Sequence, residues 1–476
     1  MKKSAYLIGI KGVGMTALAV YLKEKGYIVT GSDTSDVFAT DSILKKFGIG
    51  IKKGFTRENI EKKYDLVVTT GAWGGMTNPE AKRAIELGLP TYPHGKAVGL
   101  LSQDACGISV AGCHGKTTTS ALIASLLTSA GLKPSYIIGT AQINNLGQPG
   151  HFGGGKYIVL EADEYMTCPV TDKTHRFLWQ HPRILVMTNI EYDHPDAFAN
   201  IEDVKDAFVR LTENVSDEGI VIACCDSKEI QDILPRIKRK VITYGFSPQA
   251  DYRIEKCYFG SCVSFMHVVQ GDIALGEYML RISGKHNLLN ALAAGIAANY
   301  VGISWDKIKE YFKVFAGTKR RFEKICEVGT MLLYDDYAHH PSEIVATVRA
   351  SKEWFPDKRV VVLFQPHTFS RTKALFIEFA KSFKGADLTV ITDIYPSGRE
   401  QFDKTISSEM LVAAAKKYTK NVTYQGNKKE VLKFLKENIS DNDLLLTMGA
   451  GDIFLLHQDI EKLMRESRRH VGEKSL

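Results

Sequence analysis

The stretch Gly107-Ile-Ser-Val-Ala111, followed at once by Gly112-Cys-His-Gly-Lys-Thr-Thr-Thr119, decides the fold of this chain. An apolar strand leads into a glycine-rich turn, and residues 120–130 then have the pattern of a helix. Strands that alternate with helices indicate parallel, doubly wound sheets, so we expect an α/β protein. Further apolar strands that alternate with helical stretches are found at 6–10, 65–69, 157–160, 184–188, 331–334, 360–364, 388–391 and 444–448.

The glycine-rich turn has the residue types that hold a nucleotide phosphate. Gly112 and Gly115 let the backbone wrap a phosphate, and the N–H groups at the start of a helix donate to its oxygens. Lys116 can reach the β- and γ-phosphates, and the Thr117 hydroxyl can ligate Mg²⁺. Val110 stands where the standard phosphate loop has its first glycine, so the pattern is the shorter GxxGKT form. An accidental turn with a surface lysine is the alternative, and the strand and helix on either side argue against it.

Acidic residues follow two other predicted strands of the same block. Glu161-Ala-Asp163-Glu164 ends one strand, and Asn189-Ile-Glu191-Tyr-Asp193-His194 leaves another. The carboxyl ends of parallel strands face the ligand crevice, and Mg²⁺ prefers oxygen ligands that it shares with phosphates. Either motif alone is more typical of loop decoration, but two of them beside a phosphate loop favour a catalytic role.

The start of the chain carries a second glycine motif. Gly12-Val-Gly14-Met-Thr-Ala17 follows the first strand, and Asp33 ends the second. This is the GxGxxA form of the dinucleotide fingerprint, which on its own suggests NAD and an oxidoreductase. The motif binds a diphosphate, however, and a UDP-sugar also has one. An oxidoreductase does not account for Lys116 and Glu161.

Polar residues also gather at a helix start and after two late strands. His286, Asn287 and Asn290 share one helix face, which leaves an N-cap and an adenine or ribose contact equally open. Asp335 to Pro341 and Phe364 to Thr372 each follow a strand, where α/β sites form. Their His and Asp residues allow a metal site, but the ATP chemistry expected elsewhere favours phosphate contacts and acid–base or orienting roles.

Length and composition limit the number of domains and the classes of partner. The 476 residues predict two to four domains, and a net charge of +7 without a long basic run argues against nucleic acid as a partner. The eight cysteines form no CxxC pair, so we expect reduced thiols and no zinc. The apolar run 5–10 is too short for a signal peptide or a membrane span, which predicts a cytoplasmic protein with no membrane partner.

Together these motifs resemble the Mur ligase family, which builds the peptide stem on UDP-N-acetylmuramic acid. The resemblance spans essentially the whole chain, in the order of the family's three domains. The motifs that carry it are GIKGVGMTALA, GSD, NPE, AGCHGKTTT, EADE, TNIEYDH, GKHNLLNALAA, TKRRFE, DDYAHHPSE, FQPHTFSRT and MGAGDI. It implies a Rossmann-like UDP-sugar domain at 1–104, a central ATP-binding P-loop domain at 105–316, and a C-terminal Rossmann-like domain at 317–476 that binds the amino acid and closes on ATP.

The resemblance also implies roles for single residues. Gly12, Gly14 and Met15 would surround the UDP diphosphate, with Asp33 toward the nucleoside. The loop from Gly112 through Cys113, His114, Gly115, Lys116 and Thr117 to Thr118 would hold ATP. Thr117, Glu161 and His194 would lie on or near Mg²⁺, and His286, Asn287 and Asn290 would meet the adenosine. Arg321, Asp336 and His339 would close onto ATP, and His367 and Arg371 would lie near the incoming amino acid. The implied catalytic set is Lys116, Glu161, His194, Arg321 and His339.

The implied reaction uses ATP and Mg²⁺ to join L-alanine to UDP-N-acetylmuramate through an acyl phosphate, in the cytoplasmic synthesis of the peptidoglycan precursor that serves wall biogenesis, cell shape and division. The enzyme would be a monomer or a homodimer. Residues 165–181 are atypical of L-alanine ligases and resemble a sister ligase that attaches the recycled tripeptide L-alanyl-γ-D-glutamyl-meso-diaminopimelate. Thr368 stands where some members have arginine. The tripeptide or another amino acid is therefore the alternative acceptor, and a silent binding protein on the same scaffold is a further alternative.

Overall fold

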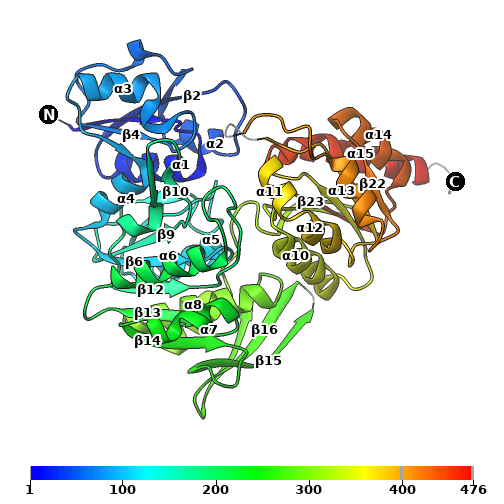
Figure 1. The fold of residues 1–476 in the computed structure, drawn as a ribbon. Coiled ribbons are helices and arrows are strands. Elements are labelled where there is room, and N and C mark those ends of the chain that lie inside the picture. The colour runs from blue at the N-terminus through cyan, green and yellow to red at the C-terminus, as the bar shows by residue number, and fades with distance from the viewer. Residues whose placement is uncertain (1, 261, 397–399, 473–476) are drawn as a thin grey trace. The chain divides into compact units, whose positions relative to one another are not determined.

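The computed structural model describes residues 2–260, 262–396 and 400–472 (Figure 1). The chain forms two compact units. The first contains residues 1–258, 265–281 and 286–319, and the second contains residues 259–264, 282–285 and 320–476.

The first sheet of unit 1 is parallel, with strand order β3-β2-β1-β4-β5. Side chains of β1 alternate between two cores: Leu7 packs with α1 and α4 on one face, and Tyr6 packs with α3 on the other. Figure 1 shows α3 on the opposite side of this sheet from α1 and α4. The elements are β1 (Ser4–Ile8), α1 (Val13–Glu24), β2 (Ile28–Asp33), α2 (Asp41–Lys46), β3 (Gly50–Lys53), β4 (Leu66–Thr69), α3 (Pro79–Glu86), β5 (Thr91–Pro93) and α4 (His94–Ser102).

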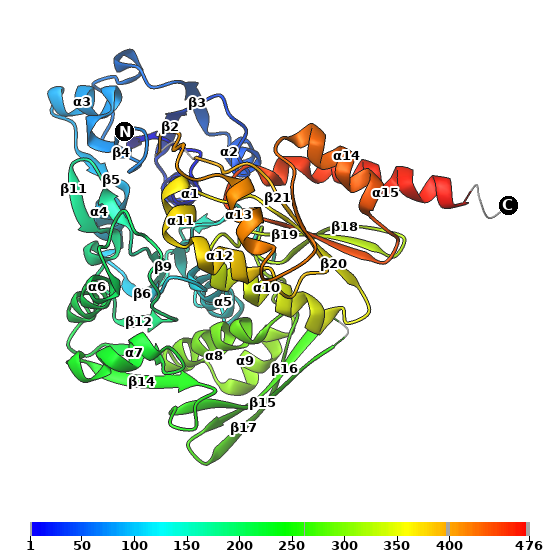
Figure 2. The same ribbon diagram turned by 45° about the vertical axis from the view of Figure 1, so that its right-hand side comes forward.

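The central sheet has the order β17-β16-β15-β14-β13-β12-β6-β9-β7-β8, and its parallel part puts the carboxyl ends of β6, β9 and β12 side by side. Ile137, Ile158 and Leu160 of this sheet share a core with α1, which fixes the first sheet beside it. At the far edge α9 lies against β17 (Figure 2). Its strands are β6 (Cys106–Ala111), β7 (Ser135–Ile137), β8 (Gly150–His151), β9 (Tyr157–Ala162), β12 (Ile184–Met187), β13 (Ile220–Cys224), β14 (Lys240–Gly245), β15 (Tyr252–Gly260), β16 (Val263–Gln270) and β17 (Ile273–Leu280). Its helices are α5 (Lys116–Ser129), α6 (Ile201–Glu213), α7 (Lys228–Ile233), α8 (Lys285–Tyr300) and α9 (Trp305–Phe312).

A small antiparallel hairpin, β10 (Met166–Cys168) and β11 (Asp172–His175), follows β9, and the 3₁₀ turn η3 (Arg176–Trp179) comes directly after it. This hairpin and turn occupy most of the segment 165–181, which the sequence marked as atypical.

Unit 2 contains a third sheet, with strand order β18-β19-β23-β20-β21-β22; only the β18–β19 pair is antiparallel. Val360 and Val362 of β20 pack against the helices on one face, and Val361 and Leu363 pack on the other. The elements are β18 (Glu323–Val328), β19 (Met331–Asp336), α10 (Pro341–Trp354), β20 (Arg359–Phe364), α11 (Phe369–Ala374), α12 (Phe376–Ser382), β21 (Leu388–Ile391), α13 (Ser408–Ala415), β22 (Val422–Tyr424), α14 (Lys428–Asn438), β23 (Asp443–Met448) and α15 (His457–Gly472).

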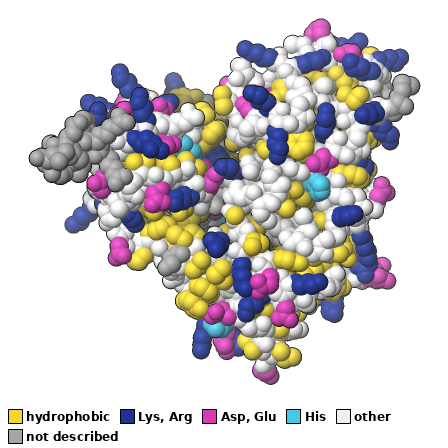
Figure 3. All heavy atoms as spheres, turned by 180° about the vertical axis from the view of Figure 1, so that it is seen from behind, with side chains coloured by type: hydrophobic (Ala, Val, Ile, Leu, Met, Phe, Trp, Pro, Cys, Tyr) yellow, Lys and Arg dark blue, Asp and Glu magenta, His cyan; other side chains and the backbone are white. Residues whose placement is uncertain are grey.

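The α/β fold with parallel sheets is confirmed, but one predicted helix boundary is wrong. α5 begins at Lys116 rather than at Ser120. Gly115 precedes it with a φ of 80°, a left-handed conformation that lets the loop turn directly into the helix. Strands β15 to β17, which are neighbours at one edge of the central sheet, were not predicted. Lys and Arg side chains are scattered among acidic and apolar ones on the face shown in Figure 3. Among the described residues, every helix is too short or too polar to cross a membrane.

Candidate active site

The phosphate loop joins β6 to the first turn of α5, as the glycine pattern predicts. Gly112 and Gly115 have φ angles of 141° and 80°, which L-residues with side chains rarely adopt. A Cβ on Gly115 would lie 2.4 Å from Oδ1 of Asn290 in α8. The loop needs glycine there because Asn290, one of the predicted adenosine contacts, packs directly against it.

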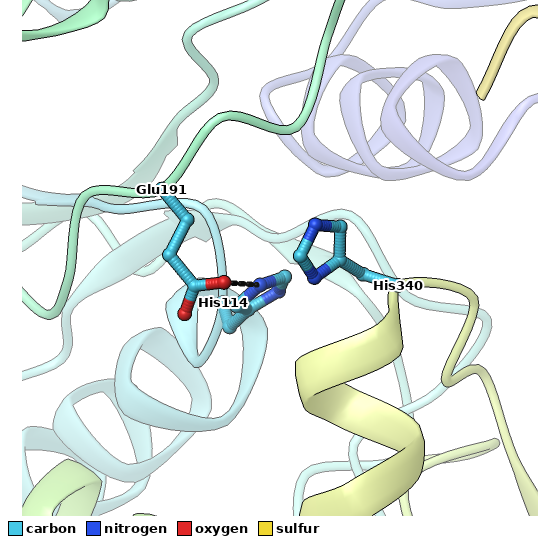
Figure 4. A group of neighbouring side chains, drawn as sticks. All are labelled: His114, Glu191 and His340. Atoms are coloured by element: carbon cyan, nitrogen blue, oxygen red, sulfur yellow. Dashed lines mark ion pairs between the residues drawn. The ribbon is translucent and has the colours of Figure 1, made fainter. Parts of the chain in front are cut away.

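The loop after β12 holds the phosphate loop from the side. The His114 N–H donates to Oδ1 of Asn189 at 2.9 Å, and Nδ2 of Asn189 donates to the His114 carbonyl at 3.0 Å. Nε2 of His114 lies 3.4 Å from a carboxylate oxygen of Glu191, an ion pair when the imidazole is protonated (Figure 4). The Cys113 thiol donates to the Glu191 carbonyl at 3.1 Å. These contacts tie the phosphate loop to the loop after β12.

Lys116 carries its charge on the first turn of α5, surrounded by acids. Its Nζ lies 2.8 Å from Glu164 and also donates to the carbonyl of Cys113 at 3.3 Å. Burial opposes ionisation of both partners, but the opposite charges outweigh it: the pKa of Lys116 is raised and that of Glu164 is lowered. The pair is therefore ionised at neutral pH, and the ammonium is ready for a phosphate oxygen.

Two carboxylates and one imidazole at this edge fit a divalent cation. Asp163 and Glu164 follow β9, His194 follows β12, and one ligand atom of each lies within 4.8 Å of the others. Burial disfavours the Asp163 anion, yet Arg176, Lys116 and His194 together lower its pKa below the usual range. Carboxylate oxygens next to a phosphate loop are the donors that Mg²⁺ takes. The sequence predicted Mg²⁺ beside the motif Glu161 to Glu164, and the resemblance assigned Glu161 to the ion. The structure adds that Asp163 and Glu164 are the two acids of this motif that lie close to His194.

The predicted ligands Glu161 and Thr117 lie nearby. Glu161 is the last but one residue of β9, beside Val110, and its Oε2 lies 2.9 Å from where a Cβ on Gly139 would be. Thr117 is buried in the first turn of α5. Their ligation of Mg²⁺ stays a prediction.

At the carboxyl edge of the first sheet, Gly12 caps α1 and Gly14 lies in its first turn. The Met15 side chain is buried in the core, so only its backbone is suited to a diphosphate. The carboxylate of Asp33 accepts the N–H groups of Lys11 and Thr34 at 2.7 and 2.8 Å. Asp33 therefore holds the glycine loop through the N–H of Lys11. The sequence predicted only a contact between Asp33 and the nucleoside.

The predicted adenosine residues lie at the start of α8. His286 is exposed, and Nδ2 of Asn290 donates to Oδ1 of Asn287 at 3.0 Å. Asn290 thus bridges the helix start and the phosphate loop.

In unit 2 the predicted ATP-closing residues gather at the carboxyl end of β19. Glu343 of α10 lies 3.5 Å from Nη1 of Arg321 and 3.2 Å from Nδ1 of His339. The buried carboxylate of Asp336 accepts the N–H groups of Phe322 and Ala338 at 3.0 and 2.9 Å. Burial raises the pKa of Asp336 to about 7, against the opposing charge of Arg321.

The predicted amino-acid residues follow β20. Nη1 of Arg371 donates to the His367 carbonyl at 3.0 Å, and the Arg371 side chain is buried. The His367 ring stacks on Tyr395 with centroids 5.8 Å apart and meets the His339 ring edge-on at 6.1 Å. Tyr395 was not predicted from the sequence: it follows β21, and a tyrosine after a strand carries no distinct sequence signal.

Comparison with known proteins finds that three segments of the chain match models of one family. Residues 4–105 match the Mur ligase family catalytic domain, residues 110–298 the Mur ligase middle domain, and residues 320–451 the Mur ligase glutamate ligase domain. The UDP-N-acetylmuramate–L-alanine ligase of Geotalea daltonii is 37% identical over 97% of this chain and 98% of its own length. The ligase of the same name from Desulfitobacterium hafniense is 38% identical over 96% and 98%.

Solved structures give the same result. The UDP-N-acetylmuramate-alanine ligase of Thermotoga maritima superposes with a TM-score of 0.82 at 26% identity and covers 98% of this chain and 100% of its own. The Neisseria ligase that attaches L-alanyl-γ-D-glutamyl-meso-diaminopimelate to UDP-N-acetylmuramate has a TM-score of 0.60 at 27% identity and covers 67% of this chain and 100% of its own. Fold and phosphate loop define a nucleotide-binding α/β protein of several sheets. The chain belongs to the Mur ligase family.

Proposed function

We propose that this chain is the ATP- and Mg²⁺-dependent ligase that joins L-alanine to UDP-N-acetylmuramate in cytoplasmic peptidoglycan precursor synthesis. The observation that carries the proposal is Lys116, ionised beside Glu164 at the head of a glycine-shaped phosphate loop. The near full-length relatives that bear this ligase name, at 37–38% identity, supply the substrate assignment.

Negative charge develops in both steps of the reaction. The muramate carboxylate attacks the γ-phosphate and displaces ADP, which gives the acyl phosphate. The amine then attacks the carbonyl of the acyl phosphate through a tetrahedral oxyanion, the nitrogen loses a proton, and inorganic phosphate leaves. Lys116 is placed to stabilise the first charge, and Arg321 is the cation that the third domain offers. Mg²⁺ held by Asp163, Glu164 and His194, with Thr117 and Glu161 close by, would neutralise the phosphate oxygens. No side chain has to act as a covalent nucleophile.

Each of the three expected domains binds its own ligand. Residues 1–104 bind UDP through Gly12, Gly14 and the Asp33-shaped loop, and residues 105–316 bind ATP. Residues 317–476 bind the amino acid through His367 and Arg371 and contact ATP through Arg321, Asp336 and His339.

The recycled tripeptide is the second candidate acceptor. The Neisseria tripeptide ligase is similar to this chain at 27% identity, and the atypical segment 165–181 forms its own hairpin and turn.

The test is phosphate release from ATP with UDP-N-acetylmuramate and Mg²⁺, measured separately with L-alanine, glycine, L-serine and the tripeptide. Release that requires the UDP-sugar and is fastest with L-alanine supports the proposal. Release with the tripeptide alone moves the chain to the recycling reaction, and no release with any acceptor contradicts both.

A further inference from the structure

Arg176, the first residue of η3, is anchored at the ligand edge of the central sheet. Its Nη1 lies 2.7 Å from Oδ2 of Asp163, and its Nε donates to the Met166 carbonyl at 3.1 Å. The guanidinium also lies over the Tyr165 ring, 5.5 Å from its centroid. Because Asp163 adjoins Glu164, the partner of Lys116, this arginine is tied to the phosphate-loop edge.

The same side chain also reaches the ligand edge of the first sheet. Its Nη2 lies 3.1 Å from where a Cβ on Gly71, after β4, would be. Its Cβ and Cγ lie 3.2 Å from the corresponding position on Gly95, in the first turn of α4. The neighbour of Gly95, His94, lies against Gly14 of the diphosphate loop: its Cε1 is 3.2 Å from where a Cβ on Gly14 would be. Glycine at 71 thus leaves room for the guanidinium beside the end of β4, and glycine at 95 leaves room for the aliphatic part of Arg176 beside the start of α4.

Two other basic side chains near this edge, His94 and Lys11, are less suited than Arg176 to bind an anion. Burial, and then the charge of Arg176, lower the pKa of His94 to about 4, so its imidazole is neutral at pH 7. The ammonium of Lys11 is held by the Asp36 carbonyl at 2.7 Å and by Asp41 at 3.4 Å. In the part of the chain that the structure describes, the hydrogen bonds of Arg176 use Nε and Nη1, and none uses Nη2.

We propose that Arg176 is a substrate-binding residue whose Nη2 donates to a phosphate oxygen of the UDP-sugar, between the Gly14 loop and the ATP edge. A planar guanidinium can hold Asp163 with one side and an anion with another, which an ammonium cannot do in the same way. The proposal rests on the proposed function, because it takes the nucleotide sugar as the ligand.

The test is calorimetric titration of the full chain with UDP and with UDP-N-acetylmuramate, in the wild type, Arg176→Met and Arg176→Lys. We expect both variants to lose about tenfold or more in UDP affinity, the size of a lost charge-assisted hydrogen bond, with a similar loss for the UDP-sugar. Arg176→Lys keeps a cation for Asp163 and serves if Arg176→Met folds poorly. Arg183→Met is the matched control, since Arg183 is half exposed and pairs with Glu218 on the surface.

Each other result overturns a distinct claim. UDP affinity unchanged in both variants, with a raised KM for ATP, makes Arg176 a support for Asp163 and nothing more. Unchanged UDP affinity with weaker UDP-sugar binding places the contact on the sugar side and overturns the diphosphate assignment. A wild type that binds neither ligand contradicts the proposed function before any variant is compared.

Discussion

At the scale of single residues, charge is concentrated where phosphate is expected. Lys116 is held by Glu164 and a loop carbonyl, and both ionised partners are largely buried. Removing one member of such a pair leaves the other as an uncompensated buried charge. Each member of the Lys116–Glu164 pair therefore helps to keep the other ionised.

Lys116→Ala is expected to abolish phosphate release, because the ammonium that would stabilise the charge on the transferred phosphate is removed. The affinity for the UDP-sugar should stay within about twofold, because Lys116 contacts loops of the central sheet and not the Gly14 loop of the first sheet. Turnover comes from the phosphate-release assay and affinity from titration calorimetry. Near-normal turnover in this variant would show that the phosphate loop is wrongly assigned.

Cys113 lies inside the phosphate loop, and the structure makes it a poor nucleophile. Burial, and then the charge of Glu164, raise its pKa well above the usual thiol value, so the thiolate is scarce at pH 8. We expect iodoacetamide to label the exposed Cys262 many times faster than Cys113. Peptide mass spectrometry over a time course measures both rates, and equal rates would contradict the buried thiol.

At the scale of elements, the hairpin β10–β11 packs against the first domain through a close glycine contact. A Cβ on Gly75 would lie 2.1 Å from Sγ of Cys168 in β10. The hairpin thus contacts the loop after β4. Gly71 lies in the same loop, and its lack of a side chain leaves room for Arg176.

Gly75→Ala is expected to destabilise the protein by about 2–4 kcal/mol in urea unfolding, through backbone strain and overpacking together. Gly88→Ala is the matched control: Gly88 also has a left-handed φ, 70° against 52°, but a Cβ there meets nothing within 4 Å. Strain alone should cost it about 1 kcal/mol. If the two variants lose equal stability, the contact with Cys168 contributes nothing.

At the scale of the whole molecule, the chain divides into two units, and the first sheet shares a core with the central one inside unit 1. A ligand of the first sheet should therefore stabilise unit 1 as a whole. The expected size is about 2.7 kcal/mol at a hundredfold excess over Kd.

In scanning calorimetry we expect UDP to raise the midpoint of one unfolding transition, that of unit 1, and to leave the other in place. Asp33→Ala should reduce this shift, because Asp33 anchors the N–H of Lys11 and so the diphosphate loop. It should leave ATP binding nearly unchanged. A shift of both transitions by UDP alone would contradict independent units, and a full shift in the variant would contradict the role of Asp33.

The sequence by itself determined the parallel α/β class, the phosphate loop and the polar strand ends, because glycine conformation and strand–helix alternation are local properties. It did not determine that Lys116 begins α5, that Asp163 and Glu164 meet His194, or that Asp33 serves its own loop. Nor did it show that Arg176 contacts Asp163 after β9 and also lies close to Gly71 after β4. Those facts depend on which strands are neighbours and on how closely glycines let distant segments approach, and only the tertiary structure decides both.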